Sequence, residues 1–201
     1  DIVSALNITL GVVEKRQTLP ILANVLFEVA ENRFKLTATD LESEVTTSGP
    51  LSNLESSGKT TTSAKKLNEL CRLIPDGEEI NLSLNGDKLN IKTTHGKYSL
   101  STLPSVDFPV FDIDSGDSPL VIPAKDLREL IRNTSFAMGN QDWRHYLNGL
   151  YLSIGGGEIT AVTTDAHRLS VANLSTQSDK SFSGIIARKS INEMVKFLSD
   201  E

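Results

Sequence analysis

A near-copy of one stretch of sequence constrains this chain more than any other feature. Residues 148–170 (NGLYLSIGGGEITAVTTDAHRLS) align without a gap on residues 23–45 (ANVLFEVAENRFKLTATDLESEV), so that Thr39-Asp40 falls on Thr164-Asp165, an offset of 125. A repeat with so long a period indicates duplicated domains rather than stacked short repeats. The 201 residues are enough for two domains of ordinary size.

The repeat extends to two helices in each copy. Residues 1–13 carry apolar or small residues at helical spacing, and the same face returns 125 residues later. A second helix is predicted over 64–74, and its face returns at an offset of 124. The four faces are Ile2, Ala5, Leu6 and Thr9; Leu127, Leu130, Ile131 and Thr134; Leu67, Leu70, Cys71 and Ile74; and Ile191, Met194, Val195 and Leu198. Helix, loop, hairpin, strand and helix therefore recur in the same order.

Hairpin signals lie between the helices. Strands are predicted at 22–30 and 33–39, at 42–48, at 79–84, 88–93 and 97–102, and at 149–154 and 158–163. Asn85-Gly86 predicts a type I′ turn, and Gly155-Gly156-Gly157 is read as a turn between strands. The predicted fold class is α+β, with repeated domains that each pack two helices on antiparallel sheets.

The domain boundaries follow from the repeat and from a proline- and aspartate-rich stretch. We predict a first domain at 1–112, a linker at 113–120 and a second domain at 121–201. The second copy contains no counterpart of residues 77–103, so we expect the chain to be a fragment with an incomplete second domain.

Composition narrows the class of protein. The chain is 38% apolar and 23% charged, and no apolar run is long enough to span a membrane. A net charge of −6 argues against a uniformly basic nucleic-acid binder, although basic residues could still gather on one surface. The single cysteine, Cys71, excludes an internal disulfide and fits a reducing, cytoplasmic setting.

No catalytic or cofactor motif is present. The sequence has no phosphate-binding loop and no dinucleotide fingerprint. His95, His145 and His167 lack the spacing of metal ligands, and Cys71 lies on an apolar helical face, where a core residue is the favoured reading. Asp40 and Asp165 each follow a strand, and both are read as turn-capping carboxylates. We therefore expect a non-enzymatic protein without cofactor or metal.

Basic residues on equivalent helices suggest binding to a negatively charged partner rather than catalysis. Lys65 and Arg72 fall on Lys189 and Lys196 at the 124 offset, which suggests a positive surface that could hold DNA phosphates. An ordinary solvated helix face is the alternative reading. The loop at 139–146 (GNQDWRHY) combines amides, cations and rings that suit a DNA backbone or stacking on bases. The same composition also fits a packed loop.

Several motifs together resemble the β subunit of bacterial DNA polymerase III, the replicative sliding clamp. They are TLPIL near residue 18, TDLE at 39–42, LSTLPSVDFP at 100–109, the block QDWRHYLNG at 141–149 and TTDAHRL at 163–169. The resemblance runs the whole length of the chain. It covers most of a first clamp domain and part of a second, with the third domain absent.

The resemblance implies a processivity factor without catalysis of its own. Such a clamp is a ring-shaped homodimer that encircles double-stranded DNA in DNA replication and is part of a nucleotidyltransferase complex. The implied partners are the DNA polymerase III catalytic subunit, a clamp loader, and other polymerases and repair factors that carry a short clamp-binding peptide. No membrane partner is implied. A duplicated peptide-binding scaffold with no role on DNA is the alternative function.

The resemblance also implies two sets of site residues. Residues at DNA-touching positions of the family are Arg16, Lys65, Gln141, His145 and Tyr146, where His145 stands in place of an expected tyrosine. Residues at positions of the family's peptide groove are Leu147, Thr164, Ala166, His167, Arg168 and Leu169, where Ala166 replaces a common glycine.

Overall fold

The chain folds into two compact units, each with its own core. The computed structural model describes residues 2–13, 19–75, 77–111 and 120–198. Unit 1 is Asp1–Ile113 and unit 2 is Asp114–Glu201. The predicted linker at 113–120 lies, except for residue 120, outside the described residues.

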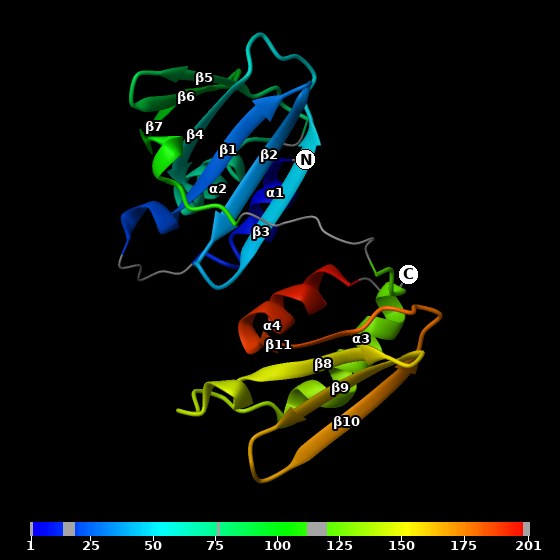
Figure 1. The fold of residues 1–201 in the computed structure, drawn as a ribbon. Coiled ribbons are helices and arrows are strands. Elements are labelled where there is room, and N and C mark those ends of the chain that lie inside the picture. The colour runs from blue at the N-terminus through cyan, green and yellow to red at the C-terminus, as the bar shows by residue number, and fades with distance from the viewer. Residues whose placement is uncertain (1, 14–18, 76, 112–119, 199–201) are drawn as a thin grey trace. The chain divides into compact units, whose positions relative to one another are not determined.

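Unit 1 is one antiparallel sheet covered by helices (Figure 1). Its strands follow the order β3-β2-β1-β4-β7-β6-β5, and β4 and β7 pair over only two residues. The elements are α1 (Ile2–Thr9), η1 (Pro20–Ala23), β1 (Asn24–Ala30), β2 (Arg33–Thr39), β3 (Glu44–Pro50), β4 (Gly58–Ser63), α2 (Ala64–Cys71), β5 (Asn81–Asn85), β6 (Lys88–Lys92), β7 (Lys97–Leu103) and η2 (Ser105–Asp107). Leu6 of α1 and Leu67 of α2 pack in one core with Val25, Leu36 and Ile91 of the sheet.

Unit 2 repeats the first part of this arrangement. Its four-stranded sheet has the order β10-β9-β8-β11, which matches β3-β2-β1-β4 of unit 1, and Figure 1 shows β9 between β8 and β10. The elements are α3 (Ala124–Thr134), η3 (Ser135–Ala137), η4 (His145–Leu147), β8 (Gly149–Gly155), β9 (Glu158–Thr164), β10 (Leu169–Ser175), β11 (Phe182–Ala187) and α4 (Arg188–Phe197). Leu130, Ile131 and Ile191 of the helices pack against Leu150 and Ile159 of the sheet.

The duplication holds at the level of single hydrogen bonds. Thr9 and Thr134 close α1 and α3, and both side chains are fully buried. The Thr9 hydroxyl donates to the carbonyls of Ala5 and Leu6 at 3.2 and 3.1 Å. The Thr134 hydroxyl donates to the equivalent carbonyls of Leu130 and Ile131 at 2.9 and 3.3 Å. A buried hydroxyl must find an acceptor, and in both helices it uses the preceding turn.

Several expected boundaries were wrong in detail. The helix predicted over 1–13 ends at Thr9, just before Gly11, a poor helix former, and the helix predicted over 64–74 ends at Cys71. Asn85 pairs with Lys88, so the turn there consists of Gly86 and Asp87, and of these two only Gly86 has a positive φ. The predicted type I′ turn at Asn85-Gly86 is therefore replaced by a turn that starts one residue later.

Three strands, β4, β10 and β11, have no counterpart among the predicted ones, and β4 was missed because its sequence carries no apolar alternation. β4 reads GKTTTS, yet Thr60, Thr61 and Thr62 are buried because the strand lies between β1 and β7. The Thr61 hydroxyl accepts from the Asn24 amide at 3.0 Å and donates to the Leu103 carbonyl at 2.9 Å. Hydrogen bonds of this kind let a polar strand occupy the middle of a sheet. No helix in the described part of the chain is long and apolar enough to cross a membrane.

Candidate nucleic-acid and peptide interface

The loop at residues 139–148, hereafter the 139–148 loop, joins α3 and η3 to β8 and is closed by main-chain contacts. The Gly139 amide donates to the Leu147 carbonyl at 2.9 Å. A Cβ atom at Gly139 would lie 2.9 Å from that same oxygen, closer than side chains tolerate. Glycine is needed here because the two ends of the loop approach each other directly.

Asp142 and Asn148 fix the middle of this loop. The Asn148 side chain accepts from the Asp142 amide at 2.9 Å and donates to the Asp142 carbonyl at 2.8 Å. The Asp142 carboxylate accepts two guanidinium hydrogen bonds from Arg144, each 3.0 Å long, and one from the Arg144 amide at 2.8 Å. These bonds from Arg144, helped by the nearby charge of His167, lower the pKa of Asp142 from 3.8 to about 2. Charge-assisted hydrogen bonds between Arg144 and Asp142 therefore hold the loop.

Arg188, the first residue of α4, anchors the start of the loop. Its guanidinium donates to the carbonyls of Met138 and Gly139 at 2.9 and 3.1 Å. Arg188 is a cation of α4, and these two hydrogen bonds give it a structural role. No sequence signal identifies this role, because the acceptors are main-chain oxygens that every residue carries.

The residues expected to touch DNA lie in both units. Gln141, His145 and Tyr146 are exposed on the 139–148 loop of unit 2, and Gln141 has a left-handed backbone with φ of 56°. Lys65, on α2 of unit 1, has a side chain that is 76% exposed. Arg16 lies outside the described residues. The structure thus brings three of the five together on one loop.

Carboxylates partly offset the positive charge on the helices. Lys65 lies 3.7 Å from Glu69, one helical turn away. Lys196 lies 2.7 Å from Glu193 on α4. Pairs as exposed as these contribute little to stability, but they reduce the field that a phosphate would meet. These two carboxylates therefore offset part of the positive charge around Lys65 and Lys196.

The residues expected in a peptide groove surround a tight turn at residues 164–168. The Asp165 carboxylate accepts from the amides of His167 and Arg168, both at 3.0 Å, and from the Arg168 guanidinium at 3.0 Å. The two amide bonds to Arg168 and His167 are the main cause of the lowered pKa of Asp165. The Thr164 hydroxyl donates to the Arg168 carbonyl at 2.7 Å and accepts from the Ala166 amide at 3.1 Å.

Exposure differs widely among these residues. Leu169 is 64% exposed at the start of β10, whereas Leu147 is only 6% exposed and packs inside the unit. His167 is exposed, and the Arg168 guanidinium lies 5.8 Å from the centre of the half-exposed Phe136 ring. Ala166 has a φ of 72°, in the left-handed region that favours glycine. Leu169, Arg168 and Phe136 are therefore the groups that offer an apolar and cationic surface.

The same turn occurs in unit 1. The Asp40 carboxylate accepts from the amides of Glu42 and Ser43 at 3.0 and 2.7 Å. The Thr39 hydroxyl donates to the Ser43 carbonyl at 2.9 Å and accepts from the Leu41 amide at 3.0 Å. Leu41 has a φ of 74°, close to that of Ala166. The reading of Asp40 and Asp165 as turn-capping carboxylates is confirmed.

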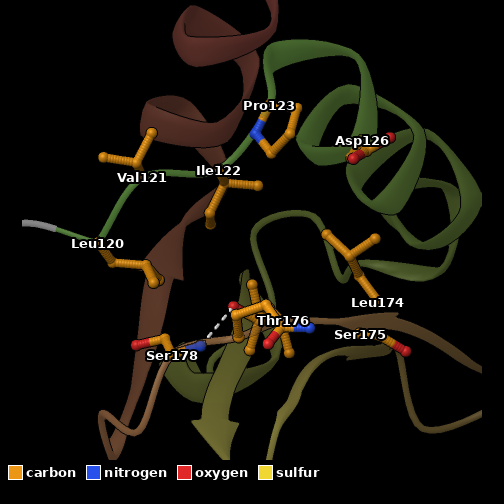
Figure 2. A pocket seen from close by; sticks show the side chains of 11 residues that line it. Leu120, Val121, Ile122, Pro123, Asp126, Leu174, Ser175, Thr176 and Ser178 are labelled. Atoms are coloured by element: carbon orange, nitrogen blue, oxygen red, sulfur yellow. Dashed lines mark hydrogen bonds between the residues drawn. The ribbon is translucent and has the colours of Figure 1, made fainter.

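The remaining candidate features are the thiol of Cys71, the possible metal ligands and a cavity in unit 2. Cys71 is 2% exposed in the core of unit 1, and burial raises the pKa of its thiol to about 11. The described residues contain no cluster of histidine, cysteine and carboxylate side chains that could hold a metal. A cavity of about 450 Å³ in unit 2 lies between residues 120–123 and 174–178 (Figure 2). Its lining includes none of the expected site residues.

Two family models match nearly the whole chain. The model for the N-terminal domain of the DNA polymerase III beta subunit matches residues 1–112, and the model for the central domain matches residues 121–201. The chain belongs to the DNA polymerase III beta subunit family. The resemblance seen in the sequence motifs and the predicted α+β clamp fold are confirmed.

Relatives agree with this assignment. The chain is 39% identical over 198 residues to the beta sliding clamp of Pseudomonas aeruginosa, covering 98% of this chain and 54% of that protein. It is 39% identical to the Escherichia coli beta sliding clamp over 184 residues, covering 91% of this chain and 50% of that protein. The chain thus spans about half the length of the curated relatives it matches.

Solved structures give the same answer. The DNA polymerase III beta subunit of Pseudomonas aeruginosa superposes with a TM-score of 0.94 at 38% identity, over 99% of this chain and 55% of that one. The beta subunit of Caulobacter crescentus gives a TM-score of 0.92 at 33% identity, over 98% of this chain and 55% of that one. Another structure of the Pseudomonas clamp contains bound griselimycin, at a TM-score of 0.92 and 38% identity, over 99% of this chain and 55% of that one.

Proposed function

We propose that the protein carrying this chain is a DNA sliding clamp, a processivity factor of DNA replication. The match of two consecutive clamp domains to residues 1–112 and 121–201 is the observation that carries the proposal. The proposed protein is a cytoplasmic ring of two subunits that encircles duplex DNA after a loader opens it. It tethers the DNA polymerase III catalytic subunit by topology and catalyses no reaction itself.

The partial offset of positive charge on the helices supports this mechanism. A ring that slides needs few and delocalised phosphate contacts, because tight contacts would pin it to one position. Lys65 and Lys196 each lie beside a glutamate, and Arg188 is engaged by main-chain carbonyls. The proposed DNA contacts are Arg16 and Lys65 in unit 1, and Gln141, His145 and Tyr146 in unit 2. Retention on DNA would then come from ring closure rather than from affinity.

The turn at residues 164–168 is the proposed seat of partner peptides. Leu169 supplies exposed apolar surface, and Arg168 and His167 supply donors for peptide carbonyls or carboxylates. Thr164 and Ala166 shape the turn, and Leu147 is buried at the end of the 139–148 loop. Polymerases and repair factors that carry a short clamp-binding peptide are the proposed partners. The griselimycin-bound relative supports a ligand site on clamps of this family.

Retention on circular DNA tests the proposal. The full-length protein is loaded on nicked circular DNA with a clamp loader and ATP, and the circle is then cut. We expect the protein to stay on the intact circle and to leave when ends are created. Retention on linear DNA, or failure to load on the circle, would contradict topological attachment and favour the peptide scaffold.

A further inference from the structure

The indole ring of Trp143 is the least explained apolar group in unit 2. It lies in the 139–148 loop, 82% exposed, and is the single tryptophan of the chain. Neither of the two hydrophobic cores includes it. Tryptophan is enriched at binding interfaces, so a ring this exposed is a candidate contact.

Hydrogen bonds on both sides of Trp143 fix the main chain that carries this ring. The two neighbours of Trp143 are Asp142 and Arg144, which are joined by three hydrogen bonds of 2.8 to 3.0 Å across it. Asn148 binds the Asp142 main chain on both sides, so the base of the loop is also fixed. The Arg144 guanidinium lies 5.7 Å from the centre of the indole. A ring held in this way loses little conformational entropy on binding.

The surroundings of the ring select a flat partner. Gln141, Asp142, Arg144 and His145 are polar, and the cavity of unit 2, lined by residues 120–123, 126, 159 and 174–178, does not include the indole, so the ring offers an exposed flat surface. A nucleic-acid base needs only such a face, since every base can stack on an aromatic ring. Bases inside a duplex are already stacked, so the available bases are unpaired ones.

We propose that Trp143 is a stacking platform for an unpaired DNA base, such as one beyond the end of a primer. This inference rests on the proposed role on DNA. Arg144 is neutralised by Asp142, so stacking rather than phosphate attraction supplies the affinity. A stacking contact neutralises no phosphate, so its contribution to binding depends only weakly on salt, in contrast to that of helix lysines.

The single tryptophan allows a direct test on the chain of residues 1–201. A short oligodeoxythymidylate is titrated while the fluorescence of Trp143 is followed, and a blunt duplex of the same length is titrated in parallel. We expect quenching by the single strand that persists as salt is raised, and little quenching by the duplex. Quenching by a leucine-rich peptide but not by the oligonucleotide would overturn the proposal in favour of a protein partner.

Variants separate stacking from folding. Stacking on one base is worth roughly 1–3 kcal/mol, so Trp143→Ala is expected to weaken binding of a labelled oligodeoxythymidylate by about 5- to 150-fold. Trp143→Phe should recover part of this loss. Leu73→Ala is the matched control, because Leu73 is 80% exposed in unit 1. Equal affinity of Trp143→Ala and the wild type would overturn the proposal even if the protein is retained on circles.

Discussion

Ala166 adopts a backbone conformation that an alanine side chain disfavours. Its φ is 72°, and the left-handed region costs a residue with a Cβ about 1–2 kcal/mol. Glycine removes this cost but gains entropy in the unfolded chain, which offsets part of the benefit. Ala166→Gly is therefore expected to stabilise the protein by about 0.5–1 kcal/mol in denaturant unfolding. Ala124→Gly, in the first turn of α3, should have the opposite sign. Destabilisation by Ala166→Gly would show that the methyl group makes a contact that outweighs the strain.

The carboxylate of Asp142 makes the stability of the 139–148 loop depend on pH. The pKa of Asp142 is about 2 in the folded protein, below the ordinary 3.8, so its contribution is present above 3.8 and is lost as pH falls toward 2. Asp142→Asn lacks this contribution at every pH. The melting temperatures of wild type and variant are expected to differ at neutral pH and to converge in this acidic range. A difference that stays constant down to pH 2 would mean that charge on Asp142 does not hold the loop.

At the scale of elements, the contact between α4 and the 139–148 loop stabilises unit 2. Arg188 is half-buried and donates two hydrogen bonds to main-chain carbonyls. Arg188→Ala removes both and is expected to cost about 1–3 kcal/mol in thermal unfolding. Lys196→Ala, on the same helix, is the control, because an exposed ion pair contributes at most about 1 kcal/mol. Equal effects of the two substitutions would show that Arg188 is dispensable as an anchor.

The repeat made much of the fold predictable at this scale. The helix faces that end in Thr9 and Thr134 were found by periodicity, and the turns at Asp40 and Asp165 by their position after a strand. β4 was not predicted, because its buried threonines are polar and their burial depends on partners that are distant in sequence. The expected helix cations show the same limit. Whether a helix cation is exposed or, like Arg188, hydrogen-bonded to main-chain carbonyls depends on tertiary contacts, and charge patterning in the sequence does not contain them.

The whole molecule consists of two units with separate cores. Unit 1 has a seven-stranded sheet and unit 2 a four-stranded one, so unit 1 buries more of its chain. We expect unit 2 to open at lower denaturant concentration than unit 1. Hydrogen exchange of β8 reports on unit 2. Alkylation of Cys71, whose thiol is buried, reports on unit 1. Coincident transitions of the two probes would show that the units unfold as one.

The turn at residues 39–43 could accept the side chains of the equivalent turn at 164–168. Its frame uses the side chains of Thr39 and Asp40 and main-chain atoms only, as the turn at 164–168 uses Thr164 and Asp165. The three residues that follow the aspartate can therefore be exchanged between the two turns without changing the hydrogen bonds of Thr and Asp that hold each turn. Placing Ala-His-Arg at positions 41–43 would therefore display the proposed peptide-binding residues a second time on an existing backbone.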